Sequence, residues 1–149
     1  MHIVLYKPDI PQNTAAIIRL GACLNFKIHL IEPCGFSLND KRFKRVVMDY
    51  EALCKIILHS DFETFLKKYK KSRIVLMTTK AKKLYHRFKF KKNDMLLFGR
   101  ESAGVPENLH KVIKNKIKVP INKKTRSLNV AMTVAIIASE ALRQKNIFN

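Results

Sequence analysis

Val119–Gln144, with the sequence VPINKKTRSLNVAMTVAIIASEALRQ, joins the end of a predicted strand to a predicted helix through a polar, basic loop. Apolar residues in its second half recur at helical spacing, at Val130, Val134, Ile137, Ala138 and Ala141. This spacing predicts a helix that begins near Asn129 and buries one face. Ser127 and Asn129 stand where free backbone N–H groups and the positive end of the helix dipole gather. A helix cap and a functional site are both open interpretations of these residues.

Apolar runs of strand length alternate with helical patterns along the rest of the chain. Strands are predicted at about 2–6, 28–31, 55–59, 74–77, 95–98 and 116–119, and helices at about 11–24, 40–47 and from Pro106. The runs IVLM at 74–77 and MLLF at 95–98 are apolar throughout, as in parallel strands that are buried on both faces. Ser60 and Glu63 have capping-box spacing and predict a further helix there. The alternation predicts an α/β fold with a mainly parallel sheet covered by helices, in one domain over residues 1–149.

The charge balance predicts a polyanionic partner. The chain has 30 Lys and Arg against 11 Asp and Glu, a net charge of +19. The basic residues cluster at 41–45, 67–73, 80–92 and 111–126. Nucleic acid is favoured over an anionic membrane surface, because the last helix carries basic residues only at its end and lacks the basic, aromatic-anchored face of a membrane-surface helix. The aromatic residues between Lys83 and Lys91 are predicted to lie in the core or the sheet rather than to stack on bases.

Other signals point to a cytosolic protein without a metal site. The apolar run 3–6 is too short for a signal peptide, and no stretch approaches the roughly 20 apolar residues of a membrane span. The three cysteines form no CxxC pair and are predicted to be reduced and mostly buried. The five histidines are scattered without the spacing of metal ligands, so we expect no zinc site.

Three loops are candidates for a ligand site, because ligands of open α/β sheets bind beyond the carboxyl ends of the strands. They are Thr78–Thr79, Gly99–Val105 and Ile121–Asn129, and each follows an apolar strand. The chain has neither a GxGxxG nor a GK[ST] motif, which disfavours an ordinary dinucleotide or P-loop site.

Three separated segments resemble the motifs of the SPOUT methyltransferases. They are PDIPQNTAAIIRLGACLNFKIHLIEP at 8–33, FGRESAGVP at 98–106 and the 119–144 segment quoted above. Within that family the chain is similar to the small stand-alone tRNA 2′-O-methyltransferases that modify the ribose of the anticodon wobble cytidine or uridine. IEPCGFSLNDKRFKR at 31–45 and MTTK at 77–80 also match that subfamily. The resemblance covers nearly the whole chain.

The resemblance implies a deep trefoil knot in the C-terminal part, a homodimer, tRNA as substrate through its anticodon stem-loop, and S-adenosylmethionine as methyl donor. It also implies that backbone groups of the three loops hold the donor, at Met77, Thr78, Gly99, Glu101, Gly104, Val119, Ile121, Ser127 and Leu128. Gly99 is expected to let the main chain approach the donor where a Cβ would intrude. The implied catalytic residues are Asn13 and Arg19 at the ribose, Glu101 as the acid of the second motif, and Asn129 in the third motif.

The chain departs from the family pattern at four positions. It has Ala15 where the family usually has Gly, and Met132, Ser139 and Ala103 where Asn, an aromatic residue and Arg are common. Two other functions stay open: a 2′-O-methyltransferase of another tRNA site or of ribosomal RNA, and a non-catalytic knotted RNA-binding module.

Arg19 follows the apolar pair Ile17–Ile18 and has two interpretations. It forms a structural ion pair with Glu101 or Glu140, or it faces the ribose hydroxyl. Because the pKa of arginine exceeds about 12, the second role is one of orienting the hydroxyl and stabilising the forming alkoxide rather than accepting its proton.

Overall fold

The computed structural model describes residues 1–145, apart from the side chains of Arg42, Met48 and Glu51, so one residue of the basic run 41–45 lies outside the described side chains. The strands are β1 (His2–Tyr6), β2 (Lys27–Ile31), β3 (Ile56–His59), β4 (Ile74–Met77), β5 (Lys83–Leu84), β6 (Met95–Phe98) and β7 (Asn115–Lys118). The helices are α1 (Pro11–Leu24), α2 (Lys41–Glu51), α3 (Phe62–Lys68), α4 (Glu107–Val112), α5 (Val130–Arg143) and the 3₁₀ turn η1 (Tyr85–Arg87).

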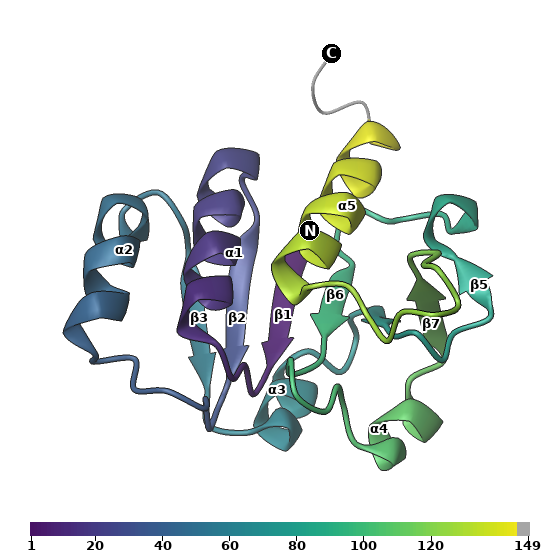
Figure 1. Ribbon diagram of the computed structural model, residues 1–149, viewed down its shortest axis with the longest axis horizontal. Helices are drawn as coiled ribbons and strands as arrows, with labels where there is room; N and C mark the ends of the chain where they lie inside the picture. The colour runs from purple at the N-terminus through teal and green to yellow at the C-terminus, as the bar shows by residue number, and fades with distance from the viewer. Residues whose placement is uncertain (146–149) are drawn as a thin grey trace.

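The described strands form one sheet in the order β3-β2-β1-β6-β4-β7-β5, and every pairing between neighbours is parallel (Figure 1). This confirms the predicted α/β fold. No helix within residues 1–145 has the length and hydrophobicity needed to cross a bilayer.

Helices cover both faces of the sheet, so its central strands alternate between two cores. Ile3 and Leu5 of β1 pack in the core under α1, α2 and α5, whereas Val4 and Tyr6 pack in the core under α3 and α4. β4 and β6 alternate in the same way, and all four residues of β6 are buried. The unbroken apolar runs of the sequence therefore reflect burial on two sides.

Two local predictions are wrong at α3 and at the cysteines. The cap of α3 is Asp61, whose carboxylate accepts the Thr64 N–H at 2.7 Å, rather than a Ser60–Glu63 capping box. A carboxylate is the stronger acceptor and stands one residue closer to the helix. Cys54 alone is buried; Cys34 is partly exposed and Cys23 is exposed, and all three are free thiols.

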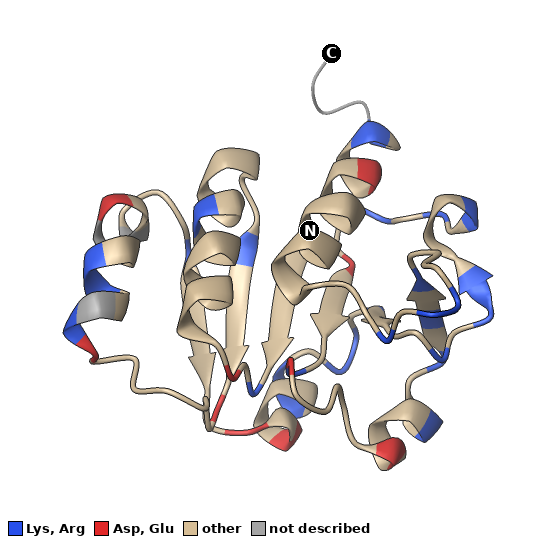
Figure 2. Ribbon diagram, in the orientation of Figure 1, with Lys and Arg blue, Asp and Glu red and all other residues tan. Residues whose placement is uncertain are grey.

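Residues 80–92 hold the elements that periodicity did not predict, the short β5 and η1. Phe88 and Phe90 in this segment are 6% and 2% exposed, which confirms that they are core residues. Figure 2 shows Lys and Arg concentrated along the flank that carries β5, β7 and the loop before α5. The basic side chains thus project outward while the aromatic rings of the same segment fill the interior.

Three histidines that are far apart in the sequence meet on β1, β2 and β3. His2 Nδ1 lies 2.8 Å from His29 Nε2, and His29 Nδ1 lies 2.9 Å from His59 Nε2. Burial lowers the pKa of His2 to about 4 and of His29 to about 3, and it also lowers the pKa of His59. The parallel register of the three strands, and no local spacing, produces this histidine chain.

Candidate active site

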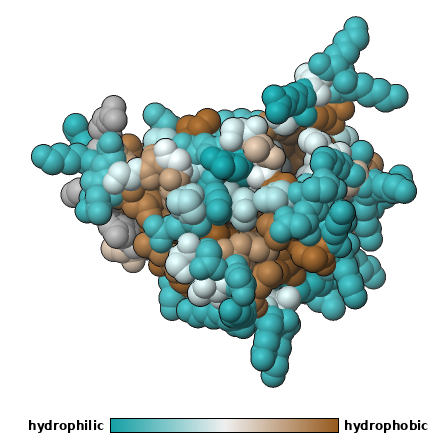
Figure 3. Space-filling view, turned by 90° about the horizontal axis from the view of Figure 1, so that it is seen from below, coloured by the Kyte–Doolittle hydropathy of each residue, from teal (hydrophilic) through white to brown (hydrophobic). Residues whose placement is uncertain are grey.

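A cavity of about 570 Å³ lies beyond the carboxyl ends of β4, β6 and β7. In the view onto this edge of the sheet, hydrophobic surface gathers in the middle and hydrophilic side chains project around it (Figure 3). The predicted loops line the cavity together, and so do all nine residues predicted to hold the methyl donor: Met77, Thr78, Gly99, Glu101, Gly104, Val119, Ile121, Ser127 and Leu128. The start of α1 closes the cavity with Ile10 and Asn13.

The loop after β6 folds back on itself at one wall of the cavity. Arg100 and Gly104 exchange backbone hydrogen bonds of 3.0 and 2.8 Å, and Gly104 has a φ of +69°. A Cβ at position 99 would stand 2.5 Å from the carbonyl carbon of Gly104. Gly99 is therefore needed because its own loop passes so close, and the expectation that a Cβ would also intrude on the ligand stays a prediction.

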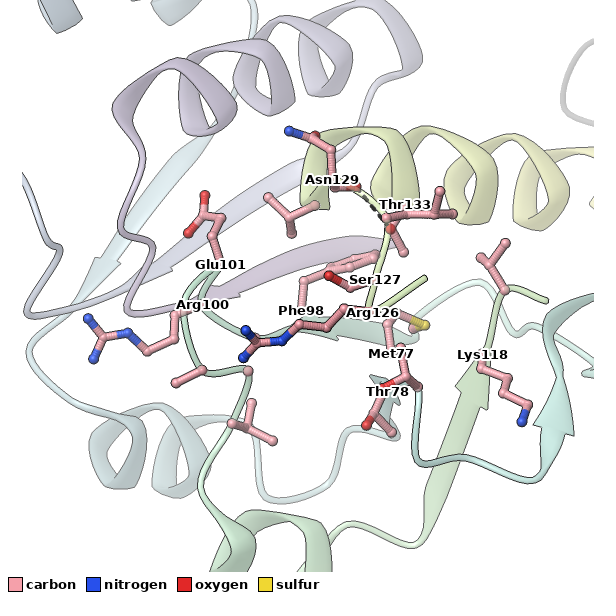
Figure 4. Close-up of a pocket in the computed structure, with 18 of the residues that line it drawn as sticks. Met77, Thr78, Phe98, Arg100, Glu101, Lys118, Arg126, Ser127, Asn129 and Thr133 are labelled. Atoms are coloured by element: carbon pink, nitrogen blue, oxygen red, sulfur yellow. Dashed lines mark hydrogen bonds between the residues drawn. The ribbon is translucent and has the colours of Figure 1, made fainter. Parts of the chain in front are cut away.

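A chain of hydrogen bonds ties the three predicted motifs together. Asn129 Nδ2 donates to Asn13 Oδ1 at 2.9 Å, and Asn13 Nδ2 donates to Glu101 Oε1 at 3.0 Å. The second oxygen of Glu101 accepts the Asp9 N–H at 2.8 Å. We call these four residues the pocket chain. They hold the starts of α1 and α5 and the loop after β6 in one arrangement, and Figure 4 shows two of them, Glu101 and Asn129, at the cavity.

Asn129 carries both interpretations that the sequence left open. Its Oδ1 accepts the N–H groups of Ala131 at 2.8 Å and Met132 at 3.2 Å, which makes it the N-cap of α5. Its amide nitrogen is left to bond Asn13. The Oδ1 atom of Asn129 therefore caps the helix, and its Nδ2 atom links the helix to the pocket chain.

Asp9 neutralises a cation at the same wall. Its carboxylate accepts Arg100 Nε at 3.1 and 3.2 Å and the Ser102 N–H at 3.1 Å. The hydrogen bond from Arg100 is the main reason that the pKa of Asp9 falls to about 2. Asp9 had no predicted role, although a carboxylate directly after β1 is a signal once β1 is known to lie beside β6.

The remaining cations of the cavity wall differ in their partners. Lys80 is paired with Glu107 at 2.8 Å, whereas Arg126 makes no hydrogen bond or ion pair within residues 1–145. Figure 4 shows the Arg126 side chain extending across the cavity in front of Phe98. Arg126, like Thr133 and His110 on the same wall, was not predicted, because cavity walls assembled from several loops leave no local pattern.

Arg19 lies outside the wall of this cavity, on the exposed side of α1. Its guanidinium stands 5.2 Å from the centre of the Tyr50 ring of α2. Both predicted ion pairs are wrong, because Glu101 bonds Asn13 and Asp9 while Glu140 pairs with Arg143 at 2.8 Å. The fold thus brings together Asn13, Glu101 and Asn129 at the cavity. Arg19 of the same polypeptide lies away from them.

Comparison with known proteins identifies the family. The model of the SpoU rRNA methylase family matches residues 1–139. The chain belongs to this family. The family predicted from the three motifs is therefore confirmed.

Relatives of this SpoU methylase family member match it over nearly their full length. A tRNA (cytidine(34)-2′-O)-methyltransferase from Beijerinckia indica is 43% identical over 144 residues, which cover 95% of this chain and 90% of that protein. The protein of the same name from Escherichia coli K12 is 36% identical, with 97% and 93% covered. A solved structure described as giving structural insights into the 2-OH methylation of C/U34 on tRNA superimposes with a TM-score of 0.93 at 36% identity, covering 97% of this chain and 95% of that one.

Proposed function

We propose that this SpoU family member transfers a methyl group from S-adenosylmethionine to the ribose 2′-hydroxyl of the wobble cytidine or uridine in a tRNA anticodon. The observation that carries the proposal is the cavity in which the pocket chain joins all three motifs. The near full-length relatives named as tRNA (cytidine(34)-2′-O)-methyltransferases support the choice of substrate.

The cavity suits a methyl donor of this size and chemistry. Its volume of about 570 Å³ lies within the roughly 300–1,000 Å³ of small-molecule sites. Phe98, Ile117 and Ile137 give it an apolar floor, while backbone groups of the three loops surround it. The nine predicted residues would hold the donor there, with no metal. When bound, S-adenosylmethionine supplies a methyl group that is already activated on a sulfonium sulfur.

The protein's own task is then mainly to position the two reactants, which can supply about 7–11 kcal/mol of a reaction barrier. The pocket chain suits this task, because Asn13 bonds neighbouring motifs through both polar atoms of its side chain and Asn129 through one, so both side chains are held in place. Glu101 accepts from two donors and acts as the anchor of the chain. We assign Arg19 to orienting the ribose hydroxyl and stabilising its developing charge.

The position of Arg19 supports a second copy of the protein in the proposal. Because Arg19 is exposed and lies outside the wall of its own cavity, we assign it to the ribose at the cavity of a partner subunit. Apolar side chains beside the cavity favour such a homodimer: Ile10 is 41%, Leu128 42% and Met132 62% exposed. Burying them against a second copy removes apolar surface from water. Sedimentation should give about twice the chain mass of 17.3 kDa.

Mixed dimers test the shared site directly. Arg19→Ala and Glu101→Gln chains should each be inactive alone, because each pure dimer lacks one element at both sites. In an equal mixture half of the dimers are mixed, and one of their two sites is complete, so about a quarter of parent activity should return. Methylation by Arg19→Ala alone at the parent rate would remove Arg19 from the mechanism.

The substrate itself is tested by mass spectrometry of ribose methylation in tRNA and ribosomal RNA incubated with the protein and the donor. We expect one methyl group, at the wobble nucleotide. Methylation elsewhere in tRNA or in ribosomal RNA would support the other methyltransferase function, and RNA binding without methylation would support the non-catalytic module.

With a net charge of +19, the affinity of the protein for tRNA should fall steeply as the salt concentration rises.

The proposal also covers the domain organisation, the knot and the location of the protein in the cell. The chain acts as one methyltransferase domain over residues 1–149, its C-terminal part forms the trefoil knot of the family, and it works in the cytosol beside its tRNA. Limited proteolysis that leaves two separately stable pieces would contradict the first of these features.

A further inference from the structure

A second groove, of about 480 Å³, lies at the opposite end of α5 from the cavity. It is lined by residues 86–90 on one side and by residues 143–145 on the other. We call it the basic groove. At about 1.5 Å per residue, Arg143 at the groove lies about 21 Å along α5 from Asn129, and about 9 Å from Ile137, the last residue of α5 that lines the cavity.

Hydrogen bonds hold the backbone of the basic groove in place. Gln144 Oε1 accepts the Phe90 N–H at 3.0 Å, and Gln144 Nε2 donates to the Phe88 carbonyl at 2.9 Å. From the other side Arg73 donates to the Lys89 carbonyl at 2.8 Å. The segment is thus clamped between the end of α5 and the start of β4, and its basic side chains are presented from a fixed backbone.

Positive charge at the groove is left uncompensated on the surface. Two acids beside the groove are turned inward: Asp94 is 1% exposed and paired with Arg73, and Glu140 is 12% exposed and paired with Arg143. Arg87, Lys89 and Lys145 are exposed and make no ion pair within residues 1–145. Figure 2 shows that Lys and Arg residues continue from here along the flank past β5 and β7.

The chemistry of the groove fits phosphate groups better than bases or lipid. Its two phenyl rings, Phe88 and Phe90, are buried against each other with centroids 5.2 Å apart, so they offer neither a stacking platform nor a membrane anchor. Exposed Arg and Lys on a fixed backbone are the groups that contact nucleic-acid phosphates and position them without reading sequence.

We propose that the basic groove binds the phosphate backbone of the anticodon stem while the wobble nucleotide enters the cavity. This inference rests on the proposed function. Phosphates along one strand of a DNA duplex are about 3.4 Å apart along the axis, so the roughly 21 Å from Asn129 to the groove corresponds to about six nucleotides. That distance leads from the middle of a hairpin loop into the stem beneath it. The groove therefore gives this chain of 149 residues a surface that binds a structured RNA.

The test neutralises one residue from each wall of the groove, in the variant Arg87→Gln/Lys145→Gln. Lys27→Gln/Lys55→Gln is the matched control, since both lysines are exposed and lie outside the groove. Binding of full-length tRNA and of a single-stranded anticodon-loop oligonucleotide is followed by fluorescence anisotropy across a salt series. The groove variant should bind tRNA about tenfold more weakly, with a salt slope smaller by about 2, and should bind the oligonucleotide within twofold of the parent.

Two outcomes would overturn the proposal: unchanged tRNA binding by the groove variant, or an equal loss for both RNAs or for the control variant. Loss of binding to anionic phosphatidylglycerol vesicles without loss of tRNA binding would assign the groove to membranes instead. If the double variant melts early, Lys89→Glu replaces it, because that side chain is exposed and makes no hydrogen bond or ion pair with the residues that the structure describes. A parent protein that binds tRNA through the groove but methylates none would refute the proposed function and leave this inference standing.

Discussion

The pocket chain and the histidine chain are both lines of hydrogen bonds between residues distant in sequence, yet the first carries charge and the second is neutral. The pocket chain runs from Asn129 to Asp9 at the carboxyl edge of the sheet, beside an open cavity. The histidine chain lies on the sheet face under α3, where His29 packs edge-to-face against Phe65 and Tyr69.

The charge of each chain follows from its surroundings. Asp9 stays charged down to a pH near its lowered pKa of about 2, because Arg100 donates a hydrogen bond to its carboxylate. The pKa of His29 is lowered to about 3, so this residue is neutral at any higher pH. It is buried, and its ionisable neighbours are all basic: the other two histidines, Lys68 and Lys27. Burial with a charged partner stabilises an ion, and burial without one removes it. A charged, exposed network suits a site that must bind ions, whereas a neutral, buried one suits packing.

The largest effect is expected from breaking the anchor of the pocket chain with Glu101→Gln. Glutamine keeps one acceptor oxygen, so either Asn13 or the Asp9 N–H loses its partner. Losing a charged hydrogen bond worth about 1.5–3 kcal/mol should lower kcat/KM for tRNA by about 10- to 10²-fold. Glu107→Gln is the control, because Glu107 is 64% exposed and pairs only with Lys80. Equal kinetics for both variants would show that the pocket chain is not part of the site.

A slightly smaller effect is expected from Gly99→Ala, which forces the loop that carries Glu101 to move. The new Cβ meets backbone atoms of Gly104 at 2.5 and 2.6 Å, and backbone cannot swing aside. We expect a loss of about 1–3 kcal/mol in stability together with the loss of donor binding in calorimetry. In the control Gly21→Ala, the nearest atom is the flexible end of Ile28 at 2.7 Å, so donor binding should persist. Full donor binding by Gly99→Ala would show that the loop is not required for the cavity.

Acidification should affect the histidine chain and the pocket chain in different pH ranges. The histidines have folded pKa values below the usual 6.5, so below pH 6.5 the unfolded state binds more protons and stability falls toward pH 4. The slope should be on the order of 1 kcal/mol per pH unit for each histidine. The stabilisation from Asp9 is lost only as pH falls from 3.8 toward about 2. Urea unfolding between pH 7 and 4 measures the first window, and His29→Gln should flatten it; an unchanged slope would contradict the assignment.

The smallest effect is expected at Asn129, where two substitutions separate the cap from the pocket chain. Asn129→Ala removes the acceptor for Ala131 and Met132 and should cost about 1 kcal/mol. Asn129→Asp keeps that acceptor but cannot donate to Asn13, so it should melt like the parent and still methylate more slowly. Parent-like turnover by Asn129→Asp would reduce the residue to a helix cap.

Sequence patterns predicted the elements wherever a local period dominates. The strands at 74–77 and 95–98 and the helix from Pro11 to Leu24 were found at the predicted residues, because continuous or 3.6-spaced apolar residues leave few alternatives. The two-residue β5 within 80–92 was missed, since a strand of that length has no period. The helix from Lys41 proved longer than predicted, ending at Glu51.

By itself, the sequence determined that the chain is α/β, that it is strongly basic, and which three loops line the cavity, since these properties depend on composition, spacing and strand ends. The tertiary structure alone decided which side chains meet. Glu101 lies 88 residues from Asn13, and Asn13 lies 116 residues from Asn129; the order of the sheet brings them within 3.0 Å. It equally left Arg19 outside its own cavity and aligned three histidines. Such contacts depend on how distant strands pair, and local patterns carry no record of that pairing.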